Sequence, residues 1–235
     1  MVQTNNTPIN LRAKFKKIGR FQFISHLDLV RTMTRIAIRS GLPLYYTEGF
    51  NPIPKLVFAA PLSIGTESFC EYLDIRLTEK VSEQDALCAL NECIGETDGE
   101  FCITEAYYPE TKLTDLKWFS YTIEIETNGF EPSLADRCVE VLLADKVTVE
   151  KKTKSGNMSL VDIRPLIKSV DSYYKDNIFF LNCVLSADQS AFLNPELVVK
   201  SLKSSCGILS DPCIVNEGYT IVRMHAYKDD MSEFR

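Results

Sequence analysis

The stretch LRAKFKKIGRFQFISHLDLVRTMTRIAIR, residues 11–39, contains both periodicities from which the first half of the chain is built. Residues 11–16 alternate apolar with basic side chains, which is the period of a β-strand with one buried and one basic face. The apolar residues 21–24 are expected to extend this strand beyond the turn KIGR. The stretch therefore opens on a strand whose basic face includes Arg12, Lys14 and Lys16.

A helix is predicted immediately after this strand. Ser25 stands three residues before Asp28, the arrangement of a capping box, so the helix begins at His26. Apolar residues then recur at helical spacing along one face, and Gly41 and Pro43 end the pattern. Asp28 is expected to serve as the carboxylate of the capping box, with pairing to arginines of the same helix as the alternative.

The patterns that follow complete a repeating order of strands and helices. The first half contains expected strands at 42–48, 55–62, 71–77 and 101–108 and an expected helix between Ser82 and Gly95. The second half contains expected strands at 120–127, 147–153, 177–186 and 213–228, helices at 132–144 and 195–206, and a less regular segment at 158–177. The first half is interpreted as the order β-α-β-β-α-β of a ferredoxin-like domain, with one strand-like run more than this order needs, and the second half repeats the order.

We therefore expect an α+β fold made of two ferredoxin-like (βαββαβ) halves in tandem, each an antiparallel sheet with helices on one face. The predicted domains are residues 1–113, which contain the basic segment 1–60, and residues 114–235, which are acidic and less regular. Residues 1–60 hold nine Lys and Arg against two Asp and Glu, a local charge of +7 in a chain of net charge −6. Such asymmetry fits a polyanion site, a docking partner or attraction between two domains.

Eight cysteines are dispersed through apolar segments of this 235-residue chain, as reduced, buried thiols usually are. The tightest group, Cys88, Cys93 and Cys102, has neither paired C-x-x-C knuckles nor the C-x-x-x-C-x-x-C spacing of an iron–sulfur cluster, so no metal ligands are predicted. No run approaches the roughly 18 apolar residues of a membrane span, and the first ten residues lack the pattern of an export signal. A soluble, cytoplasmic protein is expected.

Several strings of the sequence together resemble a known family. They are F-x-K-x-G-R-x-x-F-I-S-H-L-D-L (15–29), G-F-N-P-I-P-K (49–55), P-L-S-I-G-T-E-S (61–68), E-Y-L-D-I (71–75) and D-I-R-P (162–165). They are similar to the radical-SAM-associated, or radical-SAM-linked, family of unknown function. Its members are fused to, or encoded beside, B12-binding-type radical SAM proteins. One departure is Ile53, where many relatives are expected to have a polar or basic residue.

The resemblance implies a radical SAM protein as partner. Because this chain lacks the C-x-x-x-C-x-x-C motif, S-adenosylmethionine and the iron–sulfur cluster are expected on that partner, with no cofactor bound directly here. The expected function is that of a non-catalytic accessory protein that presents or recognises the partner's substrate, with RNA of the translation apparatus as the favoured substrate.

The candidate substrate-binding residues lie in the first domain. Arg31, Arg35 and Arg39 recur every four residues, which makes a cationic stripe about 12 Å long on the predicted helix. His26, at the first position of that helix, is a candidate for ligand contact, for structural capping or for general-base catalysis. The stripe is open to an alternative interpretation as a solvated face or a protein interface.

The loop GFNPIPK provides the remaining candidates. Its two prolines force the preceding residues into extended geometry and leave few backbone donors, so the loop is expected to be stiff. Phe50, Asn51 and Lys55 would then contact an unpaired base, or the loop would present a fixed surface to a protein. As a rigid hairpin connection it would have no binding role.

Two alternative functions remain open at this point. Tandem ferredoxin-like domains with a histidine just after the first strand are similar in architecture to CRISPR repeat-processing endoribonucleases, which cut RNA without a metal. In that alternative His26 is the general base that activates a ribose 2′-hydroxyl. In the other, the protein is purely a protein-binding module whose GFNPIPK loop docks on the radical SAM partner.

Overall fold

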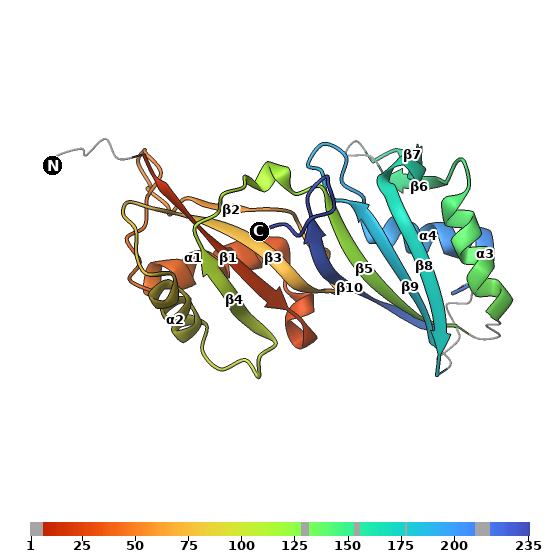
Figure 1. The fold of residues 1–235 in the computed structure, drawn as a ribbon, viewed down its shortest axis with the longest axis horizontal. Helices are drawn as coiled ribbons and strands as arrows, with labels where there is room; N and C mark the ends of the chain where they lie inside the picture. The colour runs from red at the N-terminus through yellow and green to blue at the C-terminus, as the bar shows by residue number, and fades with distance from the viewer. Residues whose placement is uncertain (1–6, 128–131, 153–155, 177, 210–216) are drawn as a thin grey trace. The chain divides into compact units, whose positions relative to one another are not determined.

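The chain is a mixed α+β protein that divides into two units, each built from helices and antiparallel strands (Figure 1). The computed structural model describes residues 7–127, 132–152, 156–176, 178–209 and 217–235. Unit 1 comprises Met1–Asp115 together with Phe234–Arg235, and unit 2 comprises Leu116–Glu233. The last two residues thus belong with the first half, whereas the division expected from the sequence places them in the second. None of the described helices has the length and hydropathy that a membrane span requires.

Unit 1 is a four-stranded antiparallel sheet with two α-helices. In chain order its elements are β1 (Ile9–Lys17), the 3-10 helix η1 (Gly19–Phe23), α1 (His26–Arg39), β2 (Leu56–Phe58), β3 (Thr66–Leu77), α2 (Glu83–Ile94), β4 (Phe101–Tyr107) and the 3-10 helix η2 (Leu113–Asp115). The strand order within the unit is β4-β1-β3-β2, and every neighbouring pair is antiparallel.

The core of unit 1 follows from the alternation in β1. Leu11, Ala13 and Phe15 are fully buried and pack with Met33 of α1 and Leu90 of α2. Both helices therefore cover the same face of the sheet. The predicted start of α1 is confirmed, because the Ser25 hydroxyl accepts a hydrogen bond from the Asp28 amide at 3.2 Å.

The segment after β1 is a correction to the sequence interpretation. Residues 19–23 form η1 and do not extend the strand. The cause is Lys17, whose buried Nζ donates to the carbonyl oxygens of Phe21, Gln22 and Ile24 at 3.2, 3.0 and 3.4 Å. Because these carbonyls turn inward to one ammonium, the backbone curls there and leads directly into α1.

Gly19 is the residue that permits this turn. Its φ is +56°, which L-residues rarely adopt, and its amide donates to Glu67 Oε1 at 2.8 Å. A Cβ at this position would lie 2.4 Å from Glu100 Oε1 and 2.5 Å from Glu100 Cδ. The side chain of Glu100 would have to move to admit even an alanine.

We expect Gly19→Ala to lower the free energy of unfolding by about 2 kcal/mol, because left-handed strain and displacement of Glu100 add together. Urea denaturation followed by circular dichroism measures this. Gly65→Ala is the matched control, since its φ is also positive (+82°) but nothing lies within 4 Å of its Cβ position. It should cost only about 1 kcal/mol. Equal losses for the two variants would contradict the role given to Glu100.

The strands expected on either side of the GFNPIP loop are much shorter than predicted. Residues 42–48 form no strand, only bridges from Leu44 to Leu77 and from Tyr46 to Pro54, and β2 is three residues long. Pro52 and Pro54 limit the pairing beside the loop, because they have no amide with which to continue a ladder toward residues 42–48. Conversely, β3 begins at Thr66, five residues before the strand expected at 71–77.

Unit 2 has the same succession of strand neighbours with an inserted hairpin. Its elements are β5 (Trp118–Glu126), α3 (Pro132–Leu143), β6 (Thr148–Lys152), β7 (Met158–Asp162), the 3-10 helix η3 (Arg164–Leu166), β8 (Ile167–Lys175), β9 (Ile178–Ser186), α4 (Pro195–Cys206) and β10 (Gly218–Tyr227). The order in its sheet is β10-β5-β9-β8, antiparallel throughout, while β6 and β7 pair only with each other.

The insertion corrects the interpretation of residues 147–177. The strand expected at 147–153 lies in the β6–β7 pair, and its place in the main sheet is taken by β8, within the segment expected to be irregular. Most side chains of β8 are exposed, because it is an edge strand. Its sequence therefore lacks the apolar alternation that reveals a half-buried strand.

Candidate functional site

The three arginines of the stripe on α1 have different surroundings. Arg31 Nη1 donates to Asp28 Oδ1 at 3.2 Å, and the Ser25 hydroxyl donates to Asp28 Oδ2 at 2.7 Å. The hydrogen bond from Ser25 and then that from Arg31 lower the pKa of the Asp28 carboxyl. Asp28 therefore stays ionised and holds Arg31, the alternative to capping that the sequence left open.

Arg35 and Arg39 instead line a pocket between α1 and the C-terminal end of α2. Its volume is about 360 Å³. The lining consists of Phe21, Ile24, Leu29, Thr32, Arg35, Ile36, Arg39, Cys93, Ile94, Glu96, Thr97 and Phe101. In the part of the chain that the structure describes, neither arginine forms an ion pair or a side-chain hydrogen bond. Arg35 and Arg39 are thus exposed residues of a pocket with a mixed polar and apolar lining, and neither has an ion-pair partner among the described residues.

His26 is exposed at the first position of α1 and does not line this pocket. Its ring meets Phe58 of β2 edge-on, with centroids 5.5 Å apart and an interplanar angle of 78°. Among the described residues the imidazole has no hydrogen-bond partner. The contact ties the start of α1 to the edge strand of the sheet.

The GFNPIPK loop is closed by hydrogen bonds across its base. The Thr47 amide donates to the Ile53 carbonyl at 2.9 Å, and the Ile53 amide donates to Thr47 Oγ1 at 3.2 Å. Phe50 at the tip is completely exposed, and Ile53 is 59% exposed. Asn51 and Lys55 are exposed as well. The loop therefore presents apolar side chains to solvent from a closed backbone.

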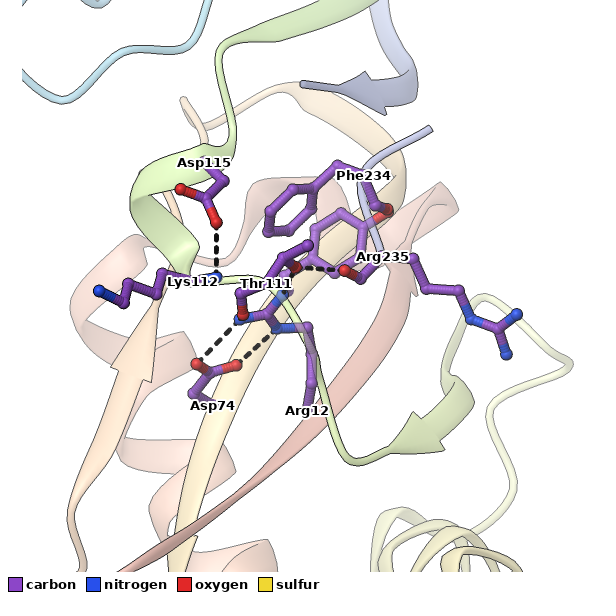
Figure 2. Close-up of polar contacts among 8 residues, drawn as sticks. Arg12, Asp74, Thr111, Lys112, Asp115, Phe234 and Arg235 are labelled. Atoms are coloured by element: carbon purple, nitrogen blue, oxygen red, sulfur yellow. Dashed lines mark hydrogen bonds and ion pairs between the residues drawn. The ribbon is translucent and has the colours of Figure 1, made fainter. Parts of the chain in front are cut away.

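Most cations of β1 are already engaged within unit 1, which corrects the predicted basic face. Arg12 is fully buried, and its guanidinium binds Asp74 through two bonds, Nε to Oδ1 at 2.7 Å and Nη2 to Oδ2 at 3.1 Å. Arg12 also donates to Thr111, to Oγ1 at 3.0 Å and to the carbonyl oxygen at 3.1 Å (Figure 2). Lys14 pairs with Glu105 at 3.1 Å. These charges are neutralised internally and are not a surface for polyanions.

Phe234 and Arg235 belong to unit 1, and Phe234 packs against its sheet beside Arg12. Phe234 is 1% exposed, and its ring meets Tyr72 edge-on with centroids 5.0 Å apart. The ring centroid lies 4.8 Å from the Arg12 guanidinium (Figure 2). The Tyr72 hydroxyl donates to the Phe234 carbonyl at 3.0 Å. The Thr111 hydroxyl donates to the Arg235 carbonyl. Arg12 is thus enclosed by a carboxylate on one side and an aromatic ring on another.

Another motif string also has a structural explanation. Asp162 Oδ1 accepts the amides of Val147 and Arg164, both at 3.0 Å, and these bonds lower the pKa of its carboxyl. Arg164 Nη1 donates to the Ile167 carbonyl at 2.9 Å. The string DIRP is therefore the turn that leads from the inserted hairpin into β8.

The described cysteines are free thiols. Within the described ranges, no three His, Cys, Asp or Glu side chains gather in a group that could hold a metal ion. Cys93 is half-buried in the lining of the α1–α2 pocket, whereas Cys88, on the same helix, is exposed. The two thiols differ in surroundings within one element.

The fold and the site define a mixed α+β protein with a mostly antiparallel sheet and four α-helices in its described ranges. The chain belongs to the family described as "uncharacterized protein conserved in bacteria (DUF2344)", whose model matches residues 10–195. That description names no radical SAM protein, so this association stays a prediction. No curated protein matches the sequence.

Two solved structures are similar over most of the chain at low sequence identity. A chain of a Cbf5-Nop10-Gar1 complex is 7% identical with a TM-score of 0.49, and the match covers 94% of this chain and 50% of that one. The chain thus spans half the length of that protein. An unknown protein from Galdieria sulphuraria is 10% identical with a TM-score of 0.28, over 92% of this chain and 99% of the other.

Proposed function

We propose that this protein is a non-catalytic accessory protein that docks on a radical SAM protein through the GFNPIPK loop. The observation that carries the docking role is Phe50, an aromatic side chain with no contact to cover it at the tip of a closed loop. Exposing an aromatic ring costs solvation free energy, which association with a partner recovers.

The loop is suited to protein recognition because its shape is set before binding. The hydrogen bonds between Thr47 and Ile53 close its base, and two prolines restrict its backbone. Little conformational entropy is then lost on association, so more of the contact free energy appears as affinity. Tyr46 and Ile53, 42% and 59% exposed, add apolar area beside Phe50.

The motif strings support a radical SAM protein as the partner. That partner would hold the iron–sulfur cluster and S-adenosylmethionine. The strand orders β4-β1-β3-β2 in unit 1 and β10-β5-β9-β8 in unit 2 support two ferredoxin-like halves. The accessory role would be to present or recognise the partner's substrate.

RNA as that substrate has weaker support than protein docking. Arg35 and Arg39 are available to phosphates, but Arg12 and Lys14 are engaged internally, which reduces the basic surface expected from composition. The endoribonuclease alternative gains no support, because His26 lies against Phe58 without a described hydrogen-bond partner.

The test uses the tagged chain to capture a radical SAM protein encoded in the same genome, with and without nuclease treatment. We expect Phe50→Ser to weaken capture about 30-fold, as loss of an aromatic hot spot of about 2 kcal/mol would. Phe23→Ser is the matched control, because Phe23 is 66% exposed in unit 1 but lies outside the loop. Full capture by Phe50→Ser would refute docking through the loop, and capture abolished by nuclease would show that RNA bridges the two proteins.

A further inference from the structure

The pocket between α1 and α2 has a cationic side. Arg35 and Arg39 are four residues apart on α1, hence about 6 Å along the helix axis, a spacing at which both can reach one tetrahedral anion. A guanidinium binds phosphate through two parallel hydrogen bonds, and two such groups match the double charge of a phosphate monoester. Since neither arginine has a partner among the described residues, no ion pair has to break first.

The rest of the lining favours an anion that is attached to a larger organic group. Seven of the twelve lining residues are apolar or a thiol: Phe21, Ile24, Leu29, Ile36, Cys93, Ile94 and Phe101. The volume of about 360 Å³ lies in the range of small-molecule sites and far exceeds that of inorganic phosphate. A phosphate alone would leave the apolar part of the pocket unfilled.

The α2 side of the pocket favours hydrogen-bond donors. Glu96 lines it just beyond the end of α2 at Ile94, and the C-terminus of a helix carries partial negative charge. A carboxylate there accepts hydrogen bonds and repels acceptors. The guanine edge offers two adjacent donors, N1–H and N2–H, whereas the corresponding edge of adenine places an acceptor beside its donor.

From the two arginines, the apolar lining and Glu96, we infer that the pocket binds a guanosine monophosphate unit, either as the free nucleotide or as an unpaired residue of RNA. The phosphate lies at Arg35 and Arg39, the ribose and base cover the apolar floor, and the base edge faces Glu96. This site is separate from the GFNPIPK loop and does not depend on the docking function.

Calorimetry with the full chain and 5′-GMP, 5′-AMP or inorganic phosphate tests the assignment. We expect GMP to bind more tightly than AMP and inorganic phosphate not to bind measurably. Arg35→Gln and Arg39→Gln should each weaken GMP binding about tenfold, as loss of a charged hydrogen bond does. Arg31→Gln is the matched control, because Arg31 lies on the same helix but is held by Asp28 outside the pocket lining. Glu96→Gln should remove the preference for GMP.

A second readout locates the ligand without relying on affinity. GMP should slow alkylation of Cys93, which lines the pocket, and leave that of the exposed Cys88 unchanged, as mass spectrometry can measure. An oligouridine with a single guanosine, compared with plain oligouridine, distinguishes RNA from free nucleotide as the source. Absence of Cys93 protection by both GMP and the guanosine-containing RNA, or equal losses in the Arg31 and Arg35 variants, would overturn the assignment. The docking function would still stand after that result, because capture of the radical SAM protein tests it separately.

Discussion

Replacing Arg12 by methionine should lower the free energy of unfolding of unit 1 by about 3–5 kcal/mol, the cost of leaving one member of a buried ion pair without its partner. Asp74 is 3% exposed and receives two hydrogen bonds from Arg12. Methionine fills much of the volume but donates nothing, so the Asp74 carboxylate would remain buried and unpaired. The two bonds to Thr111 would be lost as well.

Hydrogen exchange measured by mass spectrometry shows whether the loss of stability is confined to unit 1. Amides of β3 should exchange roughly 10² to 10⁴ times faster in Arg12→Met, whereas those of β9 serve as an internal reference. Lys14→Met is the matched control on the same strand, because its pair with Glu105 is partly exposed and contributes at most about 1 kcal/mol. Arg12→Met/Asp74→Leu should recover part of the loss, since it removes both charges. If Arg12→Met and Lys14→Met cost the same, the buried pair is not a main determinant of stability.

Phe234→Ala should destabilise unit 1 by about 3 kcal/mol, as removal of a buried phenylalanine side chain usually does. The ring is 1% exposed between Tyr72 and the Arg12 guanidinium, so its loss would leave a cavity and admit water to both. The effect should be seen in β1 and β3, more than 150 residues away in sequence but in the same unit.

Thermal denaturation, together with hydrogen exchange in β1 and β3, checks this prediction. Arg235→Ala supplies the comparison, because the neighbouring Arg235 side chain is 71% exposed, and its contacts are a 3.6 Å ion pair with Glu105 and a position 5.2 Å from the Tyr107 ring. It should change stability by less than about 1 kcal/mol. Unchanged exchange in β1 and β3 of Phe234→Ala would mean that the end of the chain only rests on unit 1.

Local patterns predicted the parts of the fold that depend on local contacts. The alternation of residues 11–16 indicated the buried face of β1, and Ser25 indicated the start of α1, because both signals come from residues a few positions apart. The edge strand β8 escaped notice because exposure removes the apolar alternation that reveals strands. The shortness of β2 was likewise missed.

The sites were predicted only in part, for a related reason. Arg12 and Arg35 are both basic residues in a basic segment, and nothing local distinguishes them. What separates them is Asp74, 62 positions from Arg12, which neutralises it, whereas no described residue does the same for Arg35. The pocket itself needs the end of α2 beside α1, a tertiary contact with no sequence signal.

The place of Phe234 in unit 1 also has a consequence for the order in which a ribosome makes this protein. A nascent chain emerges from its N-terminus, so β1 to β4 are available while all of unit 2 remains to be synthesised. At ordinary elongation rates the interval between Asp115 and Phe234 is on the order of ten seconds. During that time Arg12 and Tyr72 lack their aromatic cover. Unit 1 therefore begins to emerge before unit 2 and is completed after it.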